Sequence, residues 1–226
     1  MAAYARQRLG LRNVHYVPNG ANCDTFSPSV RPTGRFARPD YPVILWVGSG
    51  HFAWEGDGMV IELANRLKAR GSKCLIVMAG NRREGAGPYP DNVLHLGRVP
   101  HDEVPSVVAA ADICLCVYNL AAYGETGFYG SPIKLYEYMA AGKAVVATRV
   151  GEIERSVEHG VSGMLVSNDD ELDASVGQLL TDGELRGSLG AAARRKAEEY
   201  YNWDRAARQI EESILSLRQP AARQPV

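Results

Sequence analysis

Six short apolar runs, separated by helical or polar stretches, constrain the fold of this chain most. They occupy residues 43–47, 74–79, 93–96, 113–118, 144–148 and 164–166. Several of the intervening stretches, such as 59–69, place apolar residues at helical spacing. Strands that alternate with helices are typical of a parallel sheet with helices on both faces. The sequence therefore predicts an α/β protein with a doubly wound parallel sheet of about six strands and a helical C-terminal end.

The ends of these runs indicate where a ligand binds. Ligands of doubly wound sheets bind outside the carboxyl ends of the strands, which selects the loops that begin at residues 48, 80, 97, 119 and 149. The Gly48-Ser49-Gly50 stretch matches the dinucleotide fingerprint GxGxxG only in part, and GxxxxGK[ST] does not occur. These observations argue against a dinucleotide-dependent dehydrogenase and a P-loop nucleotidase.

The stretch from Gly130 to Thr148 predicts a helix followed at once by a buried strand. Ser131 is expected to cap the helix, and Pro132 suits its first position, where a missing N–H costs nothing. The amides of Ile133 and Lys134 would then be free and favour an anion. Lys134 and Glu137 are three residues apart and share a face. We therefore expect a site that takes a phosphate together with a sugar hydroxyl.

Charge and cysteine content limit the class of protein. The net charge is −1, which argues against a broad nucleic-acid or membrane-surface contact. The four cysteines show no CxxC spacing, so we expect buried, reduced thiols and a reducing cytosol. The sequence has no secretory signal and no apolar run long enough for a bilayer. No cluster of His, Cys or Asp has the spacing of a metal site.

The first thirty residues do not predict a core of their own. Residues 2–9 predict a helix and residues 14–17 a short strand, followed by the turn Pro18-Asn19-Gly20. Residues 1–30 are therefore interpreted as a remnant of a preceding domain and its linker. Residues 31–218 form the predicted ligand-binding domain, and residues 219–226 are predicted to be a disordered tail.

Four stretches resemble motifs of the retaining glycosyltransferases of group one, family four. Y-V-P-N-G-A-N-C-D-T-F-S-P at 16–28 resembles their interdomain linker, and S-P-I-K-L-Y-E-Y-M-A-A-G-K-A-V-V-A-T at 131–148 resembles their donor site. G-V-S-G-M-L-V at 160–166 and Y-N-W-D-R-A-A-R at 201–208 fit as well. The resemblance covers nearly the whole chain. It implies the GT-B architecture, in which two Rossmann-like domains face each other across a cleft.

This resemblance implies the function expected of the chain. The chain would supply the donor-binding, carboxyl-terminal half of a glycosyltransferase, with residues 203–218 as the crossover helix, and would be inactive in isolation. The donor would be a nucleotide sugar such as a UDP-, GDP- or ADP-sugar, bound without a metal or other cofactor. The partners would be the missing amino-terminal domain and a glycan, lipid or small-molecule acceptor. The location would be the cytoplasm, including the inner face of the membrane.

The resemblance also implies roles for single residues. Glu137 would accept hydrogen bonds from the ribose hydroxyls. The diphosphate would lie at the helix start after Gly130, and the nucleobase would be bound by backbone that follows the third strand. The residues expected around the donor are Gly48, Ser49, Gly97, Arg98, Val99, Gly130, Ser131, Ile133, Lys134 and Glu137.

Two departures from the family pattern are evident. Tyr129 stands where the family has the Glu that holds the donor sugar, and Glu125 is an alternative for that role. Ser49 and Glu55 stand where many relatives have an Arg and a Lys that neutralise the leaving diphosphate. A Glu at position 55 would repel phosphates unless it points away. The remaining sources of positive charge are Lys134, Arg149, Arg82 and Arg83.

Two other functions remain open from the sequence. A nucleotide-sugar epimerase shares the GT-B architecture but needs acid and base residues beside the sugar, and the linker and donor motifs favour transfer. A nucleotide or nucleotide-sugar binding module without catalysis is favoured by the missing Arg and Lys.

Overall fold

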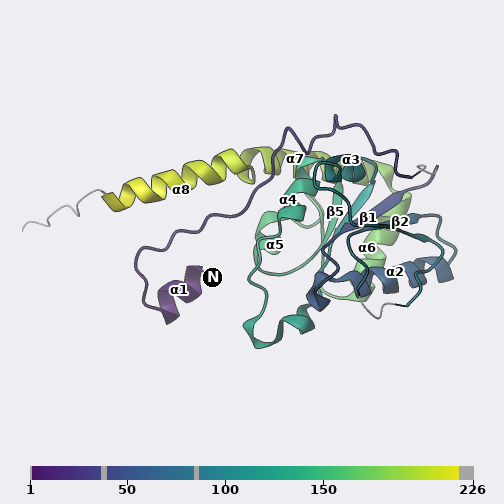
Figure 1. Ribbon diagram of the computed structural model, residues 1–226, viewed down its shortest axis with the longest axis horizontal. Helices are drawn as coiled ribbons and strands as arrows, with labels where there is room; N and C mark the ends of the chain where they lie inside the picture. Colours follow the sequence, from purple (N-terminus) through teal and green to yellow (C-terminus); the bar gives the residue numbers. More distant parts are fainter. Residues whose placement is uncertain (1, 37–39, 84–86, 219–226) are drawn as a thin grey trace, which may run out of the picture.

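The computed structural model describes residues 2–36, 40–83 and 87–218. The described residues contain one six-stranded sheet in the order β3-β2-β1-β4-β5-β6, with every neighbouring pair parallel. The sheet lies between helices (Figure 1). Its strands are β1 (Val43–Val47), β2 (Leu75–Ala79), β3 (Val93–Gly97), β4 (Ile113–Cys116), β5 (Ala144–Thr148) and β6 (Met164–Val166). The predicted fold class is therefore confirmed.

The helices follow the predicted alternation, with small differences at their ends. The described α-helices are α1 (Ala2–Arg8), α2 (Asp57–Ala69), α3 (Val104–Ala109), α4 (Ile133–Ala140), α5 (Gly151–Ser156), α6 (Asp169–Thr181), α7 (Gly183–Tyr200) and α8 (Trp203–Arg218). Two 3₁₀ segments, η1 (Ala53–Glu55) and η2 (Leu120–Thr126), lie in stretches predicted as loops. The long helix α8 extends away from the body of the domain (Figure 1).

Alternate residues of each strand pack into two separate cores. Leu45, Cys114 and Val145 lie in one core together with α4 residues, whereas Ile44, Leu115 and Val146 lie in the other with α2 and α6 residues. Successive side chains of a strand point to opposite faces of the sheet. Both faces are covered, which is why the strands read as continuous apolar runs rather than alternating ones.

The amino-terminal residues differ in part from the prediction. The helix at residues 2–9 is present as α1, but the strand predicted for residues 14–17 is wrong, because this segment has no regular secondary structure. Among the described residues, the linker segment (residues 16–28) forms one isolated β-bridge, which joins Ala21 to Asn202. The predicted disordered tail, residues 219–226, lies outside the described residues.

Candidate functional site

The carboxyl ends of β1, β2 and β3 surround a cavity of about 360 Å³. Because the three strands are parallel neighbours, loops far apart in sequence meet at this edge. The cavity is lined by Val47, Gly48, Ser49, His51, Ala79, Gly80, Asn81, Arg98, Val99 and Val104. Four of the residues expected around the donor thus lie together, and Gly97 is adjacent, since its carbonyl accepts a 2.9 Å hydrogen bond from the Gly80 amide.

The loop after β1 passes so close to the loop after β2 that glycine is required. A Cβ at Gly50, whose φ is +72°, would come within 1.8 Å of the Asn81 carbonyl oxygen. A Cβ at Gly80 would come within 2.0 Å of the Gly48 carbonyl oxygen. The Asn81 side chain donates a 2.9 Å hydrogen bond to the Ser49 carbonyl. These contacts fix the loop shape at the cavity rim.

Glu55 points into this loop and binds its backbone. The carboxylate accepts hydrogen bonds from the amides of Ser49 at 2.9 Å and Gly50 at 2.7 Å, and the residue is only 6% exposed. Burial raises the pKa of Glu55, but these hydrogen bonds and the charge of Lys134 outweigh it, so the net pKa is lowered. Glu55 is therefore a buried carboxylate with its own partners.

Lys134 holds the end of β1 from the helix side. Its ammonium donates a 2.8 Å hydrogen bond to the Val47 carbonyl and lies 5.3 Å from the Trp46 ring centroid and 5.1 Å from that of Tyr118. Burial lowers the pKa of this lysine, opposed by Cys116, Glu55 and Glu137. The Tyr138 hydroxyl accepts a 3.0 Å hydrogen bond from the Val47 amide. Helix α4 thereby fixes both polar groups of Val47.

The start of α4 differs from the predicted capping. The helix begins at Ile133, and Pro132 occupies the cap position without a side-chain cap. The Ser131 hydroxyl instead accepts a 3.1 Å hydrogen bond from the Asn19 amide, so the prediction that Ser131 caps the helix is wrong. Within the described residues, no group accepts a hydrogen bond from the amides of Ile133 and Lys134. The predicted pair of free amides is present.

Glu137 lies one turn along α4 from these amides and is half-buried. Burial raises the pKa of its carboxyl group, while His101 and Lys134 lower it. No donor among the described residues makes a hydrogen bond to this carboxylate. A half-buried acceptor without an internal partner is suited to ligand hydroxyls.

Of the two residues expected to hold the donor sugar, the structure describes the side chain of Tyr129 but only the backbone of Glu125. Tyr129 is 63% exposed, and its ring lies edge-on to Tyr123 with the centroids 6.1 Å apart. Tyr129 lies at one end of a set of neighbouring aromatic rings. Within this set the Trp54 ring stacks on Phe52, with the centroids 5.0 Å apart, and on Tyr118, with the centroids 6.1 Å apart. The backbone of Glu125 lies in η2, and its side chain lies outside those described.

The other arginines proposed as sources of positive charge have partners elsewhere. Arg83 forms a 3.3 Å ion pair with Asp57, and Arg149 lies 3.7 Å from Glu154. Arg82 lies 5.0 Å from the Tyr89 ring centroid. Among the described residues, Arg98 lines the cavity and Lys134 contacts the end of β1 beside it, so these basic side chains and the start of α4 supply positive potential there.

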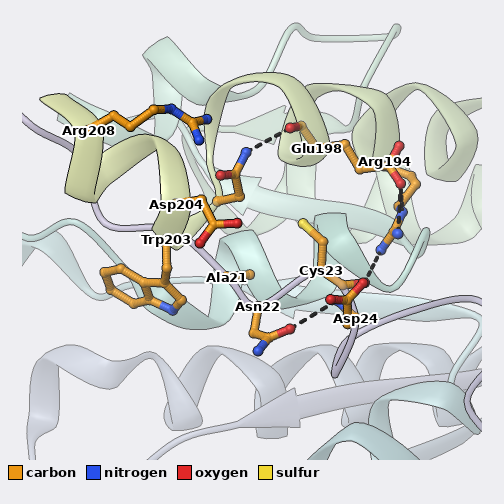
Figure 2. A pocket seen from close by; sticks show the side chains of 10 residues that line it. Ala21, Asn22, Cys23, Asp24, Arg194, Glu198, Trp203, Asp204 and Arg208 are labelled. Atoms are coloured by element: carbon orange, nitrogen blue, oxygen red, sulfur yellow. Dashed lines mark hydrogen bonds and ion pairs between the residues drawn. The ribbon is translucent and has the colours of Figure 1, made fainter.

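A second cavity, of about 510 Å³, lies between the linker segment and the α7–α8 junction. Figure 2 shows Arg194 pointing toward the linker segment, where it donates 2.8 Å hydrogen bonds to the carbonyls of Cys23 and Phe26. It also contacts the Ala140 carbonyl. The Asn22 side chain accepts 3.0 Å hydrogen bonds from the Asp24 and Thr25 amides. None of the residues predicted to bind the donor lines this cavity. Arg194 has a structural role there, because it binds backbone carbonyls of the linker segment.

The described residues offer neither a metal cluster nor a membrane-spanning helix. The described part of the chain has no group of three or more His, Cys, Asp or Glu side chains that could hold a metal ion. None of its helices is long and apolar enough to cross a membrane. Cys74, Cys114 and Cys116 are buried free thiols and Cys23 is partly exposed.

Sequence reasoning missed three polar contacts that shape this site. The Glu55 carboxylate binds backbone amides, Asn81 binds a backbone carbonyl, and Asn19 binds Ser131. Each of these contacts involves the main chain, which leaves no side-chain pattern in the sequence. The family motif around Asn19 was the one available signal.

Comparisons with known proteins identify relatives of the whole domain. The model of the family described as Glycosyl transferases group 1 matches residues 41–182. The chain is 27% identical over 228 residues to the GDP-mannose-dependent alpha-(1-6)-phosphatidylinositol monomannoside mannosyltransferase of Mycolicibacterium smegmatis, covering 92% of this chain and 57% of the relative. The chain thus spans about half the length of the curated relatives it matches.

Solved structures agree on the fold. Sucrose-phosphate synthase from Thermosynechococcus elongatus superimposes with a TM-score of 0.74 at 20% identity, over 95% of this chain and 55% of that one. Anabaena HepE in complex with UDP and glucose superimposes with a TM-score of 0.69 at 19% identity, over 88% of this chain and 56% of that one.

Proposed function

This chain belongs to the group 1 glycosyl transferases, and on that basis we propose that it supplies the donor-binding part of an enzyme that transfers a glycosyl unit from a nucleotide sugar to an acceptor, with retention of configuration. The single observation that carries the proposal is on α4. The free amides of Ile133 and Lys134 are followed along the same helix by the Glu137 carboxylate, for which the described residues supply no hydrogen-bond donor.

Each part of a nucleoside diphosphate has a complementary group at this edge. The diphosphate would lie at the α4 start, where two free amides and the helix dipole favour negative charge. The Glu137 carboxylate would accept hydrogen bonds from both ribose hydroxyls. The base would enter the 360 Å³ cavity beside Arg98 and Val99. Tyr129 would contact the sugar, with one hydroxyl where a carboxylate would offer two oxygens.

The proposed site uses no metal ion. A helix start can supply the positive potential that a cation supplies elsewhere. The relatives favour two donor bases: the mycobacterial relative is described as GDP-mannose-dependent, and HepE was solved with UDP. The acceptor, a glycan, lipid or small molecule, would lie mostly on an amino-terminal domain facing this edge.

Nucleotide titration tests the donor site directly. UDP, GDP and ADP are titrated into the chain by calorimetry, and binding of at least one is expected. Glu137→Gln keeps the side-chain volume and removes the charge, so binding should weaken by about 1–3 kcal/mol, the loss for a charged hydrogen-bond partner. Glu184→Gln, at an exposed glutamate of α7, is the matched control. Equal affinity of both variants would remove Glu137 from the site.

A binding module without catalysis is the second candidate function. Its support is Glu55, a buried anion at the position where many relatives carry a cation, with its carboxylate on the loop amides. Sugar transfer by the longest reading frame that contains this chain distinguishes the two. Nucleotide binding without transfer or donor hydrolysis in that protein favours the module.

A further inference from the structure

The linker segment is bound directly to the residue that precedes α4. The Asn19 side chain donates a 2.7 Å hydrogen bond to the Ser131 carbonyl, and the Asn19 amide donates to the Ser131 hydroxyl at 3.1 Å. The two residues are 112 positions apart in the sequence. Two hydrogen bonds from one residue fix both the position and the orientation of the Ser131 peptide.

The same segment is bound on its other side to the α7–α8 junction. The Ala21 amide donates a 2.9 Å hydrogen bond to the Tyr201 carbonyl, and the Trp203 amide donates to the Ala21 carbonyl at 3.3 Å. A Cβ at Gly20 would come within 2.6 Å of the Asn202 backbone. The backbone of the linker segment is therefore in direct contact with the backbone of the α7–α8 junction. Residues 19–21 therefore lie between the start of α4 and the start of α8.

A buried side-chain network makes a second connection. The Tyr136 hydroxyl lies 3.3 Å from the Ser131 hydroxyl and donates to the Glu152 carboxylate at 3.3 Å. The Tyr136 ring stacks on Tyr201 with the centroids 4.9 Å apart. Glu152 is 8% exposed, and after burial it is the main cause of the raised pKa of Tyr16, in the linker segment, so the two side chains face each other. Ser131 is thus bonded directly to the linker segment by Asn19, and the network of Tyr136 and Glu152 extends from Ser131 toward Tyr16.

These contacts hold the residue that precedes the uncapped start of α4. Pro132 has no side-chain cap bond, and the Pro132 carbonyl accepts a 3.1 Å hydrogen bond from the Leu135 amide, so the first turn of α4 is a unit whose place is set by the residue before it. A displacement of Ser131 would move this first turn, and the amides of Ile133 and Lys134 would move with it. Anion binding by a helix start depends on the aim of these amides.

We propose that Asn19 is a positioning residue for the anion site at the start of α4, through which the linker segment controls affinity for a nucleoside diphosphate. The inference rests on the proposed function for its ligand but not for its geometry. Because coupling is reciprocal, bound nucleotide would in turn stabilise the linker segment in this position. Any motion of the linker segment that separates Asn19 from Ser131 would lower donor affinity.

The test compares two asparagines of the linker segment. Asn19→Ala removes the donor to the Ser131 carbonyl. Asn22→Ala removes the two bonds that Asn22 makes inside the linker segment (Figure 2 shows the one to Asp24). Both variants lose linker hydrogen bonds and neither changes the charge. Affinity for UDP and GDP is measured by calorimetry, and amide exchange at Leu135, which donates to the Pro132 carbonyl at the start of α4, by NMR or mass spectrometry.

The expected result separates the two variants. Asn19→Ala should weaken nucleotide binding about tenfold and speed exchange at the α4 start, whereas Asn22→Ala should stay within twofold of the original chain in both. Equal behaviour of the two variants would overturn the proposal. If Asn19→Ala does not fold, Ser131→Ala removes the hydroxyl that accepts from the Asn19 amide, and unchanged exchange and affinity there would also count against the proposal.

Failure of the proposed function would look different. In that case the unmodified chain binds none of the nucleotides. The exchange comparison needs no ligand, so it still decides whether Asn19 orders the start of α4.

Discussion

Glu55→Gln is a sharp test of the loop at the cavity rim. The change keeps the size of the side chain but replaces one carboxylate oxygen by an NH₂ group. In the original chain each carboxylate oxygen accepts one amide, from Ser49 at 2.9 Å and from Gly50 at 2.7 Å. The glutamine oxygen can accept only one of them, so the other N–H faces a donor in a nearly dry environment.

The size of the effect follows from this count. One buried donor left without an acceptor costs about 1–3 kcal/mol of unfolding free energy. In a domain of this length, each kcal/mol lowers the melting temperature by about 2–4 °C. The expected decrease is therefore about 2–12 °C, measured by thermal and urea unfolding at pH 7.

A matched control separates this effect from the general loss of a carboxylate. Glu62→Gln breaks an ion pair with Arg66 in which the glutamate side chain is 51% exposed. Such exposed pairs contribute at most about 1 kcal/mol. If Glu55→Gln and Glu62→Gln unfold alike, the buried carboxylate does not hold the loop and the reasoning is refuted.

The pH dependence supplies an independent measurement. The net pKa of Glu55 lies below its ordinary value of 4.5 in the folded chain. A lowered folded pKa means that the stabilisation is fully present above pH 4.5 and is lost as the pH falls through the folded pKa. The stability difference between the original chain and Glu55→Gln should therefore shrink below pH 4.5. A difference that grows in acid would contradict the lowered pKa.

Two further predictions concern the linker segment. Arg194→Ala should destabilise the fold by about 2–4 kcal/mol in urea unfolding, because the carbonyls of Cys23, Phe26 and Ala140 lose a charged donor. Arg195→Ala, at the neighbouring exposed arginine, should change the unfolding free energy by no more than about 0.5 kcal/mol. Equal losses in the two variants would contradict the role of Arg194 as an anchor for the linker segment. Alkylation followed by mass spectrometry should label Cys23 alone in the folded chain, and slowly, because burial raises the pKa of its thiol. Cys114 and Cys116 should be labelled only after unfolding, because both are buried and burial raises their pKa values to about 12 and about 11. Labelling of Cys114 before Cys23 would show that the sheet opens locally.

The sheet was predictable because its signal is local and repeated. A run such as Val43–Val47 is buried on both faces, so every position must be apolar and the run stands out from polar loops. Residues 14–17 carry a similar but shorter pattern and form no strand, since a strand also needs a neighbour to receive its backbone hydrogen bonds. That requirement is not local, and the sequence does not display it.

The site was predictable only where a residue type restricts the backbone conformation, as proline does at a helix start. Pro132 indicated the helix start within one residue, and the free amides followed from helix geometry. The role of Ser131 was wrong because its hydroxyl has a partner 112 positions away, in Asn19. Glu55 was interpreted as a repulsive charge because its position in the family pattern gives no indication of where the carboxylate points, and its partners are main-chain amides.

Glu55 and Lys134 limit the ways in which the proposed site could bind an anion. The carboxylate of Glu55 occupies the loop amides of Ser49 and Gly50, and the ammonium of Lys134 is bound to the Val47 carbonyl. A flexible cationic side chain can follow a phosphate that is misplaced, because its charge acts in all directions and its stem rotates. A backbone amide cannot, because its hydrogen bond weakens steeply with angle. The nucleotide binding proposed for α4 would therefore depend on the orientation of the helix start, and the contact between Asn19 and Ser131 is the proposed determinant of that orientation.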